Sequence, residues 1–353
     1  MLVSIIIACY NHDQYVAQAI ESALNQAYPT KEVIVVDDGS TDRSAVVIAS
    51  YGNAIEPIFS SHAGQCSACN AGFARSRGDI VIFLDSDDYF LPGAVESLAE
   101  PFKTNRTVVR SQGYLTCIDT HGVPSGARIP RRLSPSGDYR EATLQRGPGA
   151  CRHPYTSGNA WARWFLERVM PLPEREELAV DACLVAVSSL LGLTASIDAP
   201  VAAYRIHDRN IGPHGETFNR QSLRRRMNRA HFTQDYLASW AGQLGYQVRL
   251  DAWRARGDSW RYRVLGYSLS TMEGSRQRIA FKEFVLSPFS TSHNRRPKAL
   301  LISALLALLW ISPRKPALAL SRLLLRLPKA PSAALESISE QRKQKRTVRS
   351  TQR

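Results

Sequence analysis

Residues 3–42 of this chain read VSIIIACYNHDQYVAQAIESALNQAYPTKEVIVVDDGSTD, two β-branched runs separated by an amphipathic segment. The runs at 3–8 and 32–36 show no alternation of polar and apolar residues, which is typical of parallel strands buried on both faces. Between them, residues 15–26 carry apolar side chains at helical spacing, and Pro29 follows the last of these. A strand, a helix and a second strand in this order predict the start of a doubly wound α/β unit.

The same alternation of strands and helices continues beyond residue 42. A shorter strand is predicted at 55–59, a helix rich in small residues at 65–76, and a fourth strand at 80–84. Ligands of doubly wound sheets bind at the carboxyl ends of the strands. Polar residues follow three of the predicted strands, at 10–11, 37–38 and 85–88. We therefore expect the functional site at this edge of the sheet.

The charge of the chain is distributed unevenly. The formal net charge is +14, but the first hundred residues hold 4 Lys/Arg against 13 Asp/Glu, so the remainder carries +23. A basic surplus of this size favours an anionic partner: nucleic acid, an anionic membrane surface or a phosphorylated substrate. The basic residues concentrate beside apolar segments and in the tail, without a recognisable nucleic-acid-binding module. We therefore expect no nucleic-acid partner.

The cysteines and the N-terminus both indicate an intracellular catalytic part. Six cysteines are present, and the single CxxC at 66–69 has no second half at metal-ligand spacing, which favours buried thiols in a reducing compartment. The apolar residues 2–10 lack a basic leader and a small-residue cleavage site. They are better explained as a buried first strand, so the catalytic part is expected in the cytoplasm.

The second half of the chain has weaker patterns. Residues 106–152 are rich in Gly, Pro and Ser, which predicts loops with short strands such as 113–118. Helices are predicted at 160–170 and 181–191, and a strand near 195–197. An arginine-rich helical stretch at 219–274 comes next.

Residues 299–311 (ALLISALLALLWI) are strongly apolar and flanked by basic residues on both sides. They are shorter than the roughly twenty residues of a membrane-spanning helix. Together with the apolar and basic stretch at 318–327, they predict two helices lying in the cytoplasmic membrane interface. The alternative is a pair of buried helices packed on the α/β domain. The tail at 337–353 is polar and basic, which predicts disorder.

The cluster Asp85-Ser86-Asp87-Asp88 predicts a metal site. Carboxylates held together at a binding edge repel one another, so a cation is their natural partner. Hard oxygen ligands select Mg²⁺ or Mn²⁺, which commonly bridge to substrate phosphates. The pattern DxD is weak by itself, and its place at a strand end strengthens it. The chain has no GxxxxGK[ST] loop and no GxGxxG after the first strand, which argues against a P-loop ATPase and a dinucleotide dehydrogenase.

These motifs together resemble family 2 glycosyltransferases of the GT-A fold. The resemblance rests on residues 3–42, 64–88 (GQCSACNAGFARSRGDIVIFLDSDD), 154–163 (PYTSGNAWAR), 179–184 (AVDACL) and 204–210 (YRIHDRN). It covers about the first 210 residues. It implies a GT-A, Rossmann-like, doubly wound mixed sheet followed by C-terminal helices.

The resemblance also implies roles for single residues. It implies a nucleoside-binding set of Ala8, Tyr10 and Asp38, donor contacts by Asn70, Arg75 and Asp85, and a metal site of Asp85, Asp87 and His207 for Mn²⁺ or Mg²⁺. Asp181 occupies the place of the general base, with Glu176 and Glu177 as the next candidates. Residues 157–159 are expected on the acceptor side.

The implied activity is an inverting, metal-dependent transfer from a nucleotide-sugar, with UDP as the expected carrier. The expected acceptor is a glycan or a lipid-linked molecule in cell-surface polysaccharide or glycoconjugate assembly, at the inner face of the cell membrane. The alternative is a catalytically weak scaffold or nucleotide-sugar-binding protein. The expected domains are a glycosyltransferase domain at 1–212, an arginine-rich helical extension at 213–296, membrane-interface helices at 297–328 and a basic disordered tail at 329–353.

Overall fold

The computed structural model describes residues 1–175, 178–207, 210, 218–256, 259–273, 285–286 and 296–326. The predicted candidates Glu176 and Glu177 and the predicted tail lie outside these residues. The chain divides into two compact units, the first built from residues 1–216 and 228–253, the second from 217–227 and 254–353. The functional domain boundary at residue 212 stays a prediction.

The first part of the chain folds into the predicted alternation. Its elements are β1 (Val3–Cys9), α1 (Val16–Leu24), β2 (Lys31–Asp38), α2 (Ser44–Ala49), β3 (Glu56–Ser60), α3 (Gln65–Arg75) and β4 (Ile80–Asp85). Strand β1 pairs in parallel with β2 and with β4, and β2 pairs in parallel with β3. In this register Ala8 lies opposite Asp85 and Cys9 opposite Asp37. The three polar clusters therefore meet at one edge of the sheet, as the sequence predicts.

The sheet continues with elements from the second half of the first unit. These are β5 (Tyr89–Phe90), α4 (Ala94–Thr104), β6 (Val108–Ile118), β7 (Pro124–Ile129), β8 (Gly137–Asp138), α5 (Arg140–Arg146), β9 (Asn159–Ala162), α6 (Arg163–Val169), α7 (Val180–Leu191) and β10 (Leu193–Arg205). The strand order is β3-β2-β1-β4-β9-β6-β10-β5, with β7 on β6 and β8 on β10. Because β9 runs antiparallel between β4 and β6, the sheet is mixed.

One prediction for this half is wrong and another is incomplete. The helix predicted at 160–170 begins only at Arg163, because residues 159–162 form the strand β9. In the region 106–152, the predicted short strand 113–118 is confirmed as part of the eleven-residue strand β6, which begins earlier, at Val108. Its residues Arg110, Ser111 and Gln112 are fully buried, which removes the apolar signal of a core strand. Arg110 donates to Cys151 and Thr194, and Gln112 to Ser196, so these polar groups depend on distant parts of the chain.

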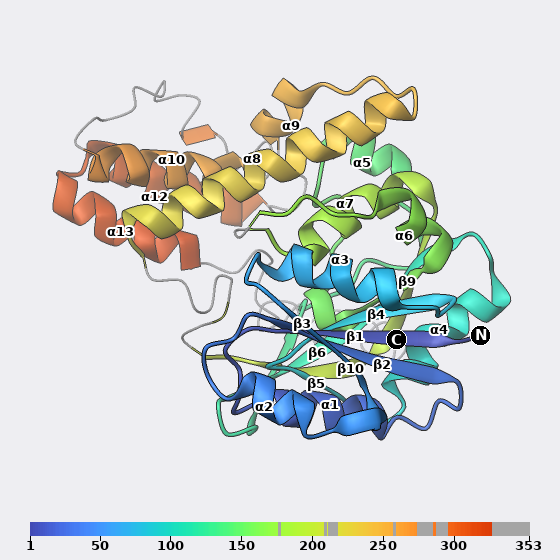
Figure 1. Ribbon diagram of the computed structural model, residues 1–353. Coiled ribbons are helices and arrows are strands. Elements are labelled where there is room, and N and C mark those ends of the chain that lie inside the picture. Colours follow the sequence, from blue (N-terminus) through green and yellow to red (C-terminus); the bar gives the residue numbers. More distant parts are fainter. Residues whose placement is uncertain are drawn as a thin grey trace, which may run out of the picture. The chain divides into compact units, whose positions relative to one another are not determined.

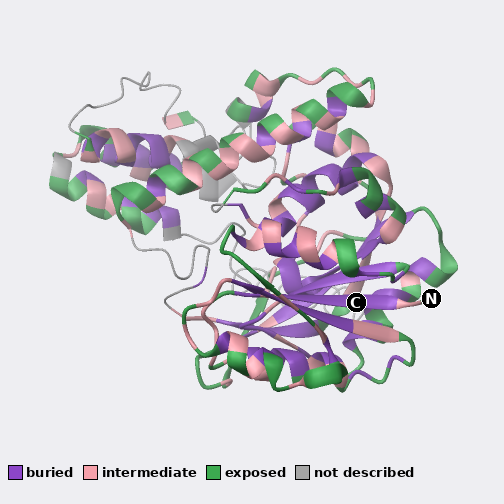
Figure 2. Cartoon of the chain, in the orientation of Figure 1, coloured by how far each residue is buried: buried purple, intermediate pink, exposed green. Residues whose placement is uncertain are grey.

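The sheet is covered on both faces. Helices α1 and α2 lie on one face and α3, α6 and α7 on the other (Figure 1). Strands β1, β2, β4 and β9 are mostly buried (Figure 2), whereas β3 and β7 are largely exposed. Beyond α7, Ala186 and Leu190 pack with Leu237, Ala241 and Trp253 of helices α8 (Arg220–Gln243) and α9 (Leu250–Arg256). This cluster adds a further helical layer on the α7 side of the sheet.

The second unit has a small helical core of its own. It contains α10 (Ser259–Met272), α12 (Arg296–Ile311) and α13 (Arg314–Arg326), so the two predicted apolar segments are helical. Val264 and Leu265 of α10 pack with Ile302, Leu306 and Leu309 of α12 and with Leu324 of α13. Within the described part of the chain, no helix is both long enough and apolar enough to cross a membrane. The six cysteines are free and buried, as predicted.

Candidate active site

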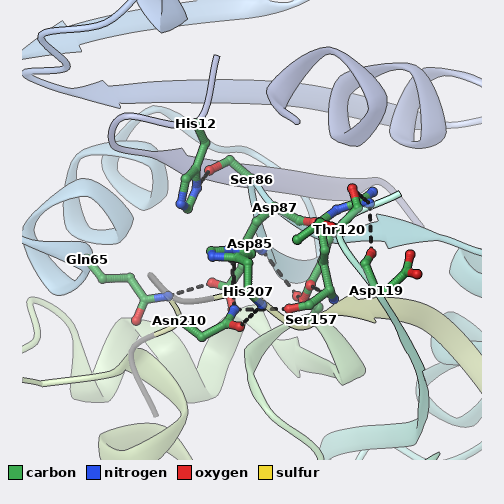
Figure 3. Close-up of polar contacts among 12 residues, drawn as sticks. His12, Gln65, Asp85, Ser86, Asp87, Asp119, Thr120, Ser157, His207 and Asn210 are labelled. Carbon is green, nitrogen blue, oxygen red and sulfur yellow. Dashed lines mark hydrogen bonds and ion pairs between the residues drawn. The ribbon is translucent and has the colours of Figure 1, made fainter. Parts of the chain in front are cut away.

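The candidate site lies in the loops after β1, β2 and β4 and in the residues after β10. Asp85 ends β4, and residues 86–88 turn the chain toward β5. His207 follows β10, whose parallel pairing with β6 brings its end to the same edge. Figure 3 shows Asp85, Asp87 and His207 close together, with His12 of the loop after β1 reaching toward them. The structure thus brings the predicted metal-site residues into one cluster.

Asp87 is the centre of this cluster. Its Oδ2 lies 2.9 Å from Nε2 of His207 and accepts a hydrogen bond of 3.3 Å from Nδ2 of Asn210. Burial by itself raises the pKa of Asp87, but the hydrogen bond with His207 and the neighbouring His12 and His207 charges lower it below its usual value. Asp87 is therefore the carboxylate of the cluster that stays ionised.

Asp85 and Asp88 have different surroundings. Burial raises the pKa of Asp85 well above its usual value, and the negative charges of Asp87 and Asp181 raise it further. Burial raises the pKa of Asp88 well above its usual value, and the negative charges of Asp87 and Asp85 raise it further. Carboxylates so placed ionise together only when a cation compensates their repulsion. Groups of ligand atoms within 4.8 Å of one another are formed by Asp85, Asp87 and Asp88 and by His12, Asp87 and His207. The chemistry of these donors fits a divalent metal ion.

Asp88 holds the loop together. Its Oδ2 accepts 2.6 Å from the hydroxyl of Ser157, and its Oδ1 accepts 3.0 Å from the backbone N–H of Arg205. Nε of Arg205 donates to the backbone carbonyl of Asp87, and Nη1 to those of Asp119 and Thr120. The buried Arg205 thus ties the acidic turn to residues 119–120, a role that the sequence alone did not reveal.

Asp181 lies in the first turn of α7 and is buried, with 8% of its surface exposed. Burial raises the pKa of Asp181 to about 6, although the positive charges of Arg229 and Arg110 oppose the shift. A carboxylate with a pKa near the working pH is suited to accept a proton. Gln65 connects the start of α7 with the metal cluster. The Nε2 of Gln65 donates a hydrogen bond of 2.5 Å to Oδ1 of Asp85, and its Oε1 accepts one of 3.3 Å from the backbone N–H of Val180, the neighbour of Asp181. Gln65 was missed from the sequence.

The predicted nucleoside residues lie beside the cluster. Ala8 faces Asp85 across β1 and β4. The ring of Tyr10 stacks on His62 with centroids 3.8 Å apart, and Tyr10 is 40% exposed. The buried Asp38 carboxylate binds Nδ1 of His62 at 2.7 Å and accepts from the backbone N–H groups of Ala63 and Gly64. Asp38 therefore orders the loop 62–64. The Tyr10 ring, stacked on His62 of this loop, presents an aromatic surface at the edge of the site.

The two predicted donor residues of α3 lie elsewhere. Asn70 hydrogen-bonds both backbone groups of Leu172 and so holds the loop before α7. Arg75 ends α3 and pairs with Glu56, with 65% of its side chain exposed. Because α3 starts at the site edge and runs about 16 Å at 1.5 Å per residue, Arg75 reaches the opposite edge of the sheet. The structure does not bring Arg75 to the cluster.

Comparison with known proteins identifies the family of the chain. A family model described as glycosyl transferase family 2 matches residues 4–158. An uncharacterized glycosyltransferase of Nostoc sp. is 33% identical over 256 residues, which cover 71% of this chain and 79% of that protein. The chain belongs to glycosyltransferase family 2. An uncharacterized glycosyltransferase of Rickettsia typhi is 41% identical over 95 residues, which cover only 30% of that protein.

The fold of this family 2 glycosyltransferase is also found in solved structures. The chain is similar to residues 1–349 of TarS from S. aureus, with a TM-score of 0.51, 16% identity and coverage of 92% of this chain and 90% of that one. At this identity the likeness concerns the fold alone. This likeness confirms the GT-A fold class predicted from the sequence, in which a mixed sheet is followed by helices.

Proposed function

We propose that this glycosyltransferase transfers a sugar from a nucleotide-sugar, with UDP as the expected carrier, to a hydroxyl of a glycan or lipid-linked acceptor, with inversion. The observation that carries the proposal is the placement of Gln65, which connects Asp85 with the first turn of α7, where Asp181 lies. A carboxylate suited to accept a proton thereby lies at the same edge as a cluster suited to a metal-bound diphosphate. The TarS structure that is similar in fold contains UDP-GlcNAc, which agrees with this carrier.

The chain's own residues have distinct tasks in this mechanism. Asp181 takes the proton of the acceptor hydroxyl, which makes the oxygen a better nucleophile toward the sugar carbon. One base facing one leaving group gives a single displacement, and hence inversion at a centre with oxocarbenium character. Asp87 and His207, with Asp85, would hold Mn²⁺ or Mg²⁺, which supplies charge neutralisation on the leaving diphosphate. Tyr10 offers its exposed ring to the nucleobase.

A thermal-shift screen of nucleotide-sugars, with and without Mn²⁺, tests the donor class. We expect UDP-sugars with Mn²⁺ to raise the melting temperature most, because a ligand that binds only the folded state stabilises it. Product analysis with a positive donor then tests turnover. Binding without transfer to a broad acceptor panel would favour the scaffold alternative. Equal shifts with GDP- or TDP-sugars would contradict the UDP assignment.

The second unit supports a further part of this proposal, association with an anionic membrane surface. Helix α12 buries Ile302, Leu306 and Leu309 and exposes Leu300, Leu301, Leu308 and Ile311, of which Leu300, Leu308 and Ile311 follow helical spacing. Lys315 and Arg322 of α13 are also exposed. An apolar stripe accompanied by basic residues is the composition of helices that lie in a membrane interface.

Vesicle flotation measures this association. We expect the full-length chain to float with vesicles containing phosphatidylglycerol, less with pure phosphatidylcholine and less in high salt, since part of the attraction is electrostatic. The double variant Leu308→Glu/Ile311→Glu should lose most of the bound fraction. Val46→Glu is the matched control, because Val46 is equally apolar and 64% exposed on α2 of the first unit. An unchanged bound fraction in the double variant would refute the role of the α12 stripe.

A further inference from the structure

His12 lies in the metal cluster, although neither the sequence patterns nor the family resemblance assigns it a role. Its ring nitrogen, the Asp87 carboxylate and the His207 ring nitrogen form a group whose ligand atoms lie within 4.8 Å of one another. We infer that His12 is a further protein ligand of the divalent metal, which adds a second imidazole to the proposed set of Asp85, Asp87 and His207. This inference rests on the proposed metal dependence of the enzyme and adds the identity of the preferred ion.

The backbone of His12 is held in place before any ligand binds. The preceding Asn11 has a positive φ of 56°, and its side-chain Oδ1 accepts hydrogen bonds from the backbone N–H groups of Thr41 and Asp42. The backbone N–H of His12 itself donates 3.0 Å to Oγ of Ser44. The loop after β1 is thus fastened to the loop after β2, so His12 needs little ordering to reach the cluster.

The ring of His12 is also oriented. Its Nδ1 lies 2.8 Å from Oγ of Ser86, the middle residue of the acidic turn (Figure 3). Histidine ligands commonly use one ring nitrogen in such a hydrogen bond, which sets the tautomer and leaves the other for the metal. Tyr15 lies against both imidazoles, stacked on His207 with centroids 5.5 Å apart and edge-on to His12 at 6.2 Å. These contacts fix the orientation of the His12 ring beside the ring of His207.

Several carboxylate oxygens of the acidic turn already accept hydrogen bonds from the protein. Both oxygens of Asp88 are engaged, one with Ser157 and one with the backbone of Arg205. One oxygen of Asp85 accepts from Gln65. The set around Asp87 is therefore richer in nitrogen than an all-carboxylate site. Mg²⁺ prefers oxygen ligands and keeps several waters, so an added imidazole disfavours it more than it disfavours the transition ion Mn²⁺. The site should therefore prefer Mn²⁺.

The variant His12→Asn separates a ligand from a purely structural residue. Asparagine places a polar atom where Nδ1 stands, within reach of Ser86, but has no equivalent of Nε2. Binding of Mn²⁺ alone and of Mg²⁺ alone is measured by calorimetric titration of the full-length protein. We expect His12→Asn to weaken Mn²⁺ binding by about 10- to 100-fold, the range seen when the surroundings of a metal site are disturbed. Mg²⁺ affinity should change far less, so the preference for Mn²⁺ shrinks.

A spectroscopic measurement gives a direct readout. In the wild-type protein loaded with Mn²⁺, electron spin-echo spectroscopy should detect coupling to the nitrogens of two imidazoles, and in His12→Asn to those of one. The exposed His231→Gln on α8 is the matched control and should leave affinity and spectrum unchanged. Melting temperatures verify that each variant is folded. Two imidazole couplings or unaltered Mn²⁺ affinity in a folded His12→Asn would overturn the inference.

The failure of the underlying function has a different signature. If the wild-type protein binds no divalent ion at all, the proposed metal site itself is wrong, and the inference falls with it. Nucleotide-sugar binding without metal, measured in the thermal-shift screen, would in that case still support the transferase function. If the wild type binds Mn²⁺ and His12→Asn binds it equally well, only the role of His12 is refuted.

Discussion

Replacing Asp181 by asparagine is expected to lower kcat by about 10²- to 10⁴-fold, the contribution typical of a general base. The same change is expected to stabilise the protein. The pKa of Asp181 is raised by burial from 3.8 to about 6, so the folded state binds a proton more readily than the unfolded chain. Stability from this group is therefore greatest below pH 3.8 and is lost as the pH rises through about 6. At pH 8 the ionised carboxylate costs on the order of 2 to 3 kcal/mol, which the amide avoids.

Rate and stability profiles against pH test this prediction together. In the wild type, kcat/KM should fall about tenfold per pH unit below about 6, because the base becomes protonated. The residual activity of Asp181→Asn should lack this limb, and its excess melting temperature over wild type should shrink toward pH 4. Asp198 is an exposed carboxylate of β10, so Asp198→Asn is the control for charge removal. A near-normal rate in Asp181→Asn would eliminate Asp181 as the base and direct attention to Glu176 and Glu177.

Replacing Asp87 by asparagine is the second change with a large expected effect. Asp87 is the acid of the cluster whose pKa is lowered, so it supplies the negative charge that a metal meets first. Asparagine keeps the size and an oxygen facing His207 but removes the charge. We expect Mn²⁺ affinity and transfer rate each to fall by at least about 10²-fold, since metal neutralisation of a leaving group contributes several kcal/mol. Calorimetry and product formation at saturating donor measure the two effects.

Asp88→Asn is the informative comparison, because the two residues are neighbours of the same type. The pKa of Asp88 is raised by burial and by nearby acids, and its oxygens serve Ser157 and Arg205. We therefore expect Asp88→Asn to change the melting temperature clearly and the Mn²⁺ affinity only slightly. If both variants lose Mn²⁺ to the same extent, the metal is held by the whole acidic turn and the special place of Asp87 is refuted.

The strands of the first half could be predicted because their signal is local. Residues 3–8, 32–36 and 80–84 are buried on both faces, so each run is apolar by itself and needs no knowledge of its partners. The acidic clusters at the strand ends follow from the same pattern, since parallel strands bring their carboxyl ends to one edge. The motif order then indicated the family, which the comparisons confirm.

Strands β6 and β9 could not be predicted in full, because their stability comes from distant residues. Strand β6 carries Arg110 and Gln112 in the core, and their partners Thr194 and Ser196 lie 84 residues away. Strand β9 is only four residues long and continues into a helix, so its apolar residues have helical spacing although it pairs between β4 and β6. Local patterns contain no information about such pairings.

For this protein, the sequence by itself determined the fold class, the family and the acidic turn with Asp85 and Asp87. Only the tertiary structure decided which side chains surround that turn. It brought Gln65 between Asp85 and α7, placed His12 beside His207, and carried Arg75 to the far edge of the sheet. The physical reason is that a strand is recognised from the burial of its own residues. A site is assembled from contacts between loops that lie tens to more than a hundred residues apart.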